Sequence, residues 1–142
     1  MNNKELYNKV QSAMYTLIKD KGIAAPVDVL ILVGVLSKED YERWRHGKVD
    51  YLERLCKINL SKLSTINHEI RVYARKNNLK ASWTDYRTWG KGSKDRLRFS
   101  KSGDENIEKL YATHYISQQS IDEAKAKRKV KQEQKDKTGE EE

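Results

Sequence analysis

The stretch DYLERLCKINLSKLSTINHEIRVYARKNN, residues 50–78, decides how the middle of this chain folds. Four of its apolar residues recur at spacings of three, four and three: Leu63, Ile66, Ile70 and Tyr73. This spacing predicts one face of a helix over about 62–77, which Asn59 or Ser61 can cap. Asp50 with Glu53 indicates the start of a shorter helix over about 51–57. We therefore expect two consecutive helices joined by a brief turn.

The side of the longer helix opposite the apolar stripe is polar. Its members recur at spacings of four, three and four: Ser64, His68, Arg71 and Arg75. At about 100° per residue, this set is rotated away from the stripe by more than about 100°. We expect these four side chains to point into solvent together.

After Asn78 the pattern changes from helical to alternating. Residues 81–89 are rich in aromatic and β-branched side chains and predict a strand. Residues 90–95 predict a loop and residues 96–100 a returning strand, so we expect a β-hairpin near 81–100 with a basic tip and return arm. Trp83 and Trp89 share one face of the first strand. We expect them to cover the helix beneath, with base stacking as the less favoured alternative.

The rest of the chain is predicted to be mainly helical. Helices are expected over 4–21, 38–46 and 105–117. The β-branched segment 27–36 fits a buried helix or a buried strand, and we favour the helix. Residues 118–142 have almost no apolar content and predict a charged tail, either a frayed helix or disordered. The expected fold is one mainly helical domain over 1–117 with a small antiparallel hairpin, in the α+β class.

The net charge of +8 is concentrated in one part of the chain. Residues 71–101, called here the basic stretch, hold ten Lys or Arg against Asp85 and Asp95, whereas the tail from 118 carries seven basic and seven acidic residues. A concentrated basic surface indicates a polyanionic partner. The aromatic residues of the same stretch make nucleic acid the leading hypothesis.

The order of helix, short turn, helix and basic hairpin over residues 50–100 resembles a winged helix-turn-helix domain. The resemblance implies that the second helix enters the major groove and that the hairpin contacts the backbone or minor groove. The residues then expected at the nucleic acid are Ser64, His68, Arg71, Arg75, Lys91, Lys94, Arg96, Arg98 and, just after the return arm, Lys101. DNA is favoured over structured RNA, with a regulatory role as one option. Symmetric recognition of DNA would favour a homodimer, although no heptad run provides an interface.

Two other functions stay open. The aromatic hairpin and segment 27–36 would suit a protein-interaction or adaptor module. A metal-dependent nuclease is disfavoured, since Asp85 and Asp95 are its only indication and such carboxylates more often balance neighbouring cations. None of His46, His68 and His114 has the spacing of a triad or metal pair. We therefore predict no catalytic residue, no metal and no cofactor.

Residues 99–105, FSKSGDE, could place hydroxyls and free N–H groups at a helix N-terminus, where anions bind. Ser102 with Glu105 also forms a capping box, and we prefer that interpretation.

The composition indicates a cytoplasmic protein with no membrane association. The most apolar stretch, Ile23 to Leu36, is too short to span a bilayer, and the start of the chain is polar. The single cysteine, Cys56, allows no intramolecular disulfide and is expected to be a small buried apolar group.

Overall fold

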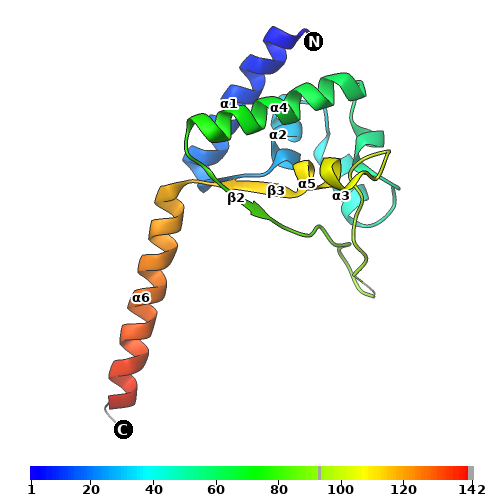
Figure 1. Ribbon diagram of the computed structural model, residues 1–142. Helices are drawn as coiled ribbons and strands as arrows, with labels where there is room; N and C mark the ends of the chain where they lie inside the picture. The colour runs from blue at the N-terminus through cyan, green and yellow to red at the C-terminus, as the bar shows by residue number, and fades with distance from the viewer. Residues whose placement is uncertain (93, 141–142) are drawn as a thin grey trace.

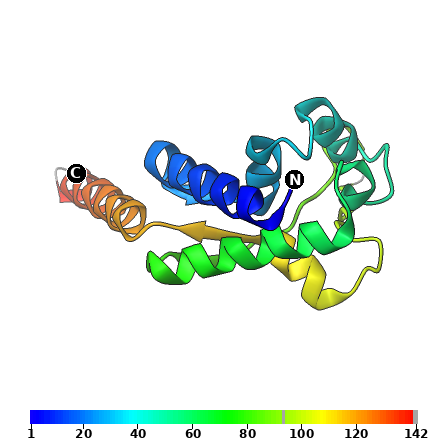
Figure 2. The ribbon, with the colours of Figure 1, turned by 90° about the horizontal axis from the view of Figure 1, so that it is seen from above.

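The computed structural model describes residues 1–92 and 94–140. Helices and strands follow in the order α1 (Asn3–Lys21), β1 (Ile23–Ala24), α2 (Pro26–Val33), α3 (Lys38–Arg45), the 3₁₀ helix η1 (Leu52–Leu55), α4 (Leu60–Lys76), β2 (Lys80–Trp83), α5 (Glu105–Ala112), β3 (Thr113–Ile116) and α6 (Gln118–Glu140). The helices α1 and α4 pack against each other on one side of a small sheet (Figures 1 and 2). The predicted class, mainly helical with a small antiparallel β component, is confirmed.

The helix predicted over 4–21 forms as α1, with a cap at each end. The Asn2 side chain accepts the Glu5 N–H at 2.8 Å, and α1 ends at Gly22, whose φ is +71°. A Cβ at Gly22 would collide with the Ser120 hydroxyl, so glycine is required there for both conformation and space. Segment 26–33 is a helix, which confirms the favoured alternative, with Pro26 in its first turn.

The predicted helix over 51–57 is wrong in type and length. Only Leu52–Leu55 is helical, as a single 3₁₀ turn, because the backbone donors around it are used elsewhere. Leu52 N–H donates to the Arg98 carbonyl at 3.2 Å, and Lys57 N–H donates to the Val35 carbonyl at 2.8 Å. A second helical turn would need the Lys57 N–H for its own ladder.

The sheet differs from the predicted hairpin. Its strand order is β1-β3-β2, with both outer strands antiparallel to β3, and β2 ends at Trp83. Residues 84–100 contain only an isolated bridge between Arg87 and Arg96 within the described residues. The partner of β2 is instead the end of the predicted helix 105–117, which leaves the helical conformation after Ala112. Thr113 and Tyr115 are β-branched and aromatic, which suits a strand.

The aromatic core is centred on Trp44, which is 0% exposed. Its ring centroid lies 5.0 Å from that of Phe99 and 5.7 Å from that of Tyr86, and its indole N–H donates to the Arg98 carbonyl at 2.9 Å. The prediction that Trp83 and Trp89 belong to the core is wrong. Trp83 is 51% exposed and Trp89 42% exposed.

The tail is a helix that leaves the domain beside the end of β3 (Figures 1 and 2). Of the two predicted forms, the helical one is found through Glu140. Most of its side chains through Lys135 are exposed, and its first turn meets the domain where Ser117 N–H donates to the Gly22 carbonyl. Among the described residues, no helix combines the length and apolar character needed to cross a membrane.

Candidate nucleic-acid interface

The outer face of α4 carries the four polar residues that the helical spacing predicted. All four are exposed: Ser64, His68, Arg71 and Arg75. The opposite face is buried through Leu63 and Ile70, each 1% exposed. The predicted orientation of this face is confirmed. One rigid element therefore presents two guanidinium groups to solvent.

A cavity of about 480 Å³ lies between α4 and α5, and we call it the α4–α5 cavity. It brings together three of the predicted site residues, Ser64, Arg71 and Lys101, although Lys101 is far from α4 in the sequence. The apolar part of its wall is formed by Leu60, Ile107, Leu110 and Tyr111. The cavity thus combines two cations with an apolar floor.

The wall of the α4–α5 cavity also contains a hydrogen-bonded carboxylate, that of Glu53. Glu53 accepts the Tyr111 hydroxyl at 2.7 Å with one oxygen and the Lys101 backbone N–H at 2.8 Å with the other. Burial and the hydrogen bond to Glu53 raise the pKa of Tyr111, so the phenol stays protonated as the donor. The hydrogen bond from the Lys101 N–H to Glu53 therefore fixes the backbone from which the Lys101 side chain extends.

The anion site considered for residues 99–105 is filled by the protein's own Glu108. Its carboxylate accepts the Phe99 N–H at 2.9 Å, the Ser100 N–H at 2.7 Å and the Ser100 hydroxyl at 2.6 Å. The predicted Ser102 capping box is wrong. Asp104 caps α5 instead, accepting the N–H groups of its second and third residues.

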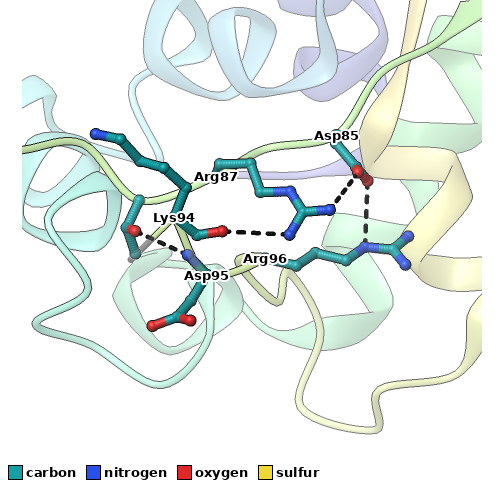
Figure 3. Close-up of polar contacts among 6 residues, drawn as sticks. Asp85, Arg87, Lys94, Asp95 and Arg96 are labelled. Atoms are coloured by element: carbon teal, nitrogen blue, oxygen red, sulfur yellow. Dashed lines mark hydrogen bonds and ion pairs between the residues drawn. The ribbon is translucent and has the colours of Figure 1, made fainter. Parts of the chain in front are cut away.

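The predicted wing is a loop, described over residues 84–92 and 94–96, whose backbone pairs as a sheet at one bridge between Arg87 and Arg96; we call it the basic loop. Asp85 pairs with Arg87 at 2.9 Å and with Arg96 at 3.3 Å, one carboxylate oxygen to each (Figure 3). The Arg87 guanidinium also donates to the Lys94 carbonyl at 3.3 Å, and the Lys94 ammonium donates to the Gly90 carbonyl. The side chains of Arg87, Lys94 and Arg96 therefore donate to acceptors within the loop itself.

Arg98 has an internal role as well as an exposed surface. Its guanidinium donates to the Ser100 carbonyl at 2.9 Å and to the Lys101 carbonyl at 3.3 Å, and it lies 5.2 Å from the Tyr51 ring centroid. These contacts hold the Arg98 guanidinium against the backbone of residues 100–101 and the ring of Tyr51.

The outer face of α4 and the basic loop do not form one winged-helix surface. In Figure 1, α4 lies above the sheet, while residues 84–92 run below it. The segment 84–92 therefore lies on the other side of the sheet from α4. Lys101, by contrast, lines the α4–α5 cavity together with Ser64 and Arg71 of α4.

Six cations of the basic stretch are exposed, and the described residues give them neither an ion pair nor a side-chain hydrogen bond: Arg71, Arg75, Lys76, Lys80, Lys91 and Lys101. Asp85, the acidic residue in the middle of the stretch, already holds two other arginines. The local excess of positive charge is therefore presented to solvent.

Two groups of catalytic type, His114 and Cys56, lie in environments that oppose such a role. His114 Nε2 lies 2.8 Å from the Tyr86 hydroxyl, and burial lowers the pKa of His114. Burial raises the pKa of the half-buried Cys56 thiol to about 12, which opposes a nucleophilic role. No group of three His, Cys, Asp or Glu among the described residues could hold a metal ion.

Sequence reasoning missed one arrangement of exposed residues. Trp83 and Arg96 lie together, with the guanidinium carbon 5.4 Å from the ring centroid. Both line a second cavity of about 500 Å³, which we call the Trp83 cavity. The alternation over 81–89 indicated only which side of a strand each residue occupies, so it could not reveal this pairing.

No protein-family model matches the chain, and neither a curated protein nor a solved structure is significantly similar to it. No site can therefore be carried over from a relative, and function follows from the residues alone.

Proposed function

We propose that this protein binds nucleic acid, with DNA favoured over structured RNA, through phosphate contacts from the basic stretch. One observation supports this above the rest: six exposed cations of residues 71–101 have no carboxylate partner among the described residues. Two of them, Arg71 and Arg75, are held on one rigid helix face.

The physical basis is counterion release. Each phosphate that a cation neutralises frees condensed counterions, so the logarithm of the binding constant falls with the logarithm of salt concentration, by about 0.9 per contact on duplex DNA. Contacts of this kind position a protein without reading sequence. The proposed activity is therefore strongly salt-dependent, and Arg71 with Arg75 should account for about two units of the slope.

An adaptor function is the second candidate, and the α4–α5 cavity favours it. Leu60 and Ile107 are 52% and 36% exposed there, and apolar surface of this kind is typical of protein contacts. Binding through this surface would be salt-tolerant, because burial of apolar area does not depend on counterions. Salt dependence thus separates the two candidates.

The test is fluorescence anisotropy with a random DNA duplex, a single strand and an RNA hairpin, from low to physiological salt. The double variant R71E/R75E should weaken binding at low salt by at least about tenfold and reduce the salt slope by about two. The matched control is K127E/K131E, which makes the same change in net charge on the exposed helix α6.

The control variant should bind within about twofold of the wild type. An equal loss in both variants would assign the binding to net charge alone and overturn a specific role for α4. If the wild type binds none of the three ligands at low salt, the nucleic-acid proposal fails and the adaptor function takes its place.

A further inference from the structure

Trp83 is a large aromatic residue with half of its surface in solvent. It ends β2, an edge strand of the sheet, and is 51% exposed. A tryptophan with no buried position contributes little to the core, while its flat face can stack on another ring.

A cationic side chain, Arg96, lies beside the Trp83 ring and is paired with Asp85. The Arg96 guanidinium lies 5.4 Å from the ring centroid, within the range of a cation–π contact. Arg96 is itself positioned by Asp85, which accepts from its Nε at 3.3 Å (Figure 3). The aromatic face and its cation are thus arranged before any ligand arrives.

The Trp83 cavity next to this pair has room for a nucleotide. Its volume of about 500 Å³ falls within the range of about 300–1,000 Å³ that small ligands occupy. The cations on its wall are Arg96, Arg98 and Lys109. Of its two carboxylates, Glu108 is turned to backbone and hydroxyl donors, which leaves Glu105 as the acidic side chain exposed there.

We propose that the Trp83 cavity binds an unpaired nucleotide of a single-stranded nucleic acid, with the base stacked on Trp83 and the phosphate beside Arg96 and Lys109. This inference rests on the proposed nucleic-acid function and specifies its ligand. A base paired within a duplex is stacked on both faces by its neighbours, so it cannot offer a free face to Trp83. The charge of the cavity wall favours a nucleotide over an apolar peptide.

Trp89, on the loop that follows β2, provides the matched comparison. It is 42% exposed, but its ring makes edge contacts with Tyr41 at 5.7 Å and with His46 at 5.8 Å, and the Arg45 guanidinium lies 4.6 Å from its centroid. Its ring is therefore already in contact with three protein groups. A change at Trp89 should not affect stacking in the Trp83 cavity.

The experiment measures the affinity of an eight-nucleotide DNA single strand and of a duplex, by anisotropy, for variants at Trp83. W83A should weaken single-strand binding by about 5- to 150-fold, the effect of losing one stacked base, and duplex binding by less than about twofold. W83F should retain most of the affinity, whereas W83L, equally apolar but without a ring, should not. W89F should bind like the wild type, and circular dichroism verifies that each variant is folded.

The outcomes separate the two proposals. If W83L binds the single strand as well as W83F does, stacking is overturned in favour of a general apolar contact. If W83A binds normally while R71E/R75E does not, the Trp83 site is wrong and the proposed function stands. Loss of binding in R71E/R75E and in W83A, with the ring requirement intact, supports both.

Discussion

Two consecutive segments of this protein, the basic loop and residues 97–101, differ in what holds them. The inner segment, residues 97–101, is fixed by carboxylates from other elements. Glu53 of η1 and Glu108 of α5 accept the backbone N–H groups of Phe99, Ser100 and Lys101. In the basic loop the charged groups pair within the loop, Asp85 with Arg87 and Arg96, while the aromatic residues Tyr86 and Trp89 attach it to the rest of the domain.

The difference shows how a charge excess arises on one surface. Glu108 is directed inward to neutral donors, so it does not pair with a surface cation. The carboxylate of Asp85 is shared between two arginines of the loop, so it offsets less than their combined charge. The inner carboxylates should therefore affect stability, and the outer charges should affect mainly binding and salt response.

The largest expected effect is from Glu108→Gln. The glutamine amide would place an N–H₂ group against donors that the carboxylate now accepts, at nearly the same volume. Hydrogen bonds to a charged group contribute about 1.5–3 kcal/mol, and the three at Glu108 are coupled, so we expect the free energy of unfolding to fall by about 2–4 kcal/mol. Urea denaturation followed by circular dichroism measures it.

Glu105→Gln is the control for that change. Glu105 lies in the first turn of the same helix and is exposed, so its loss should cost about 0.5 kcal/mol or less. Equal effects of the two substitutions would mean that Glu108 does not hold residues 99–100, and the contrast between inner and outer segments would be wrong.

The sequence predicts an element well when the residues that stabilise it are close to it in the sequence. The cap and apolar spacing of α1 and α4 are local, and both helices form as expected. The strand β3 was not predicted, because its partners at 23–24 and 80–83 are distant in sequence while His114 and Tyr115 continue a helical spacing from α5. Tertiary pairing overrides such a local pattern.

The candidate site likewise has features that the local sequence predicts and features that depend on tertiary structure. The concentration of charge in residues 71–101 and the outward direction of Arg71 and Arg75 follow from the sequence. Lys101 joins Arg71 at one cavity, while the segment 84–92 runs below the sheet, and this placement depends on where η1 and α5 hold the chain. The exposure of Trp83 follows from its place at the end of an edge strand, which alternation alone could not reveal.

A smaller effect is expected from Asp85→Asn. Its ion pairs are partly exposed, with side-chain exposures of 30% for Asp85 and 57% for Arg96, and such pairs contribute about 0–1 kcal/mol. The free energy of unfolding should fall by less than about 1 kcal/mol at low salt, and the difference should vanish in about 1 M salt because the charges are then screened. Urea melts at the two salt concentrations measure it. A loss as large as that of Glu108→Gln would remove the distinction between the two segments.

The smallest effect is expected from deleting residues 118–142, which belong to neither segment. The deleted part carries seven basic and seven acidic residues, so the net charge stays at +8. Near the domain, the deletion removes the first turn of α6 and the hydrogen bond between the Ser117 and Ser120 hydroxyls, which are 3.0 Å apart. We expect the free energy of unfolding to change by about 0.5 kcal/mol or less and nucleic-acid affinity by less than about twofold, measured by urea denaturation and anisotropy. A truncated protein that folds normally but binds tenfold more weakly would place the phosphate contacts on α6. The excess charge of the basic stretch would then not be the binding surface.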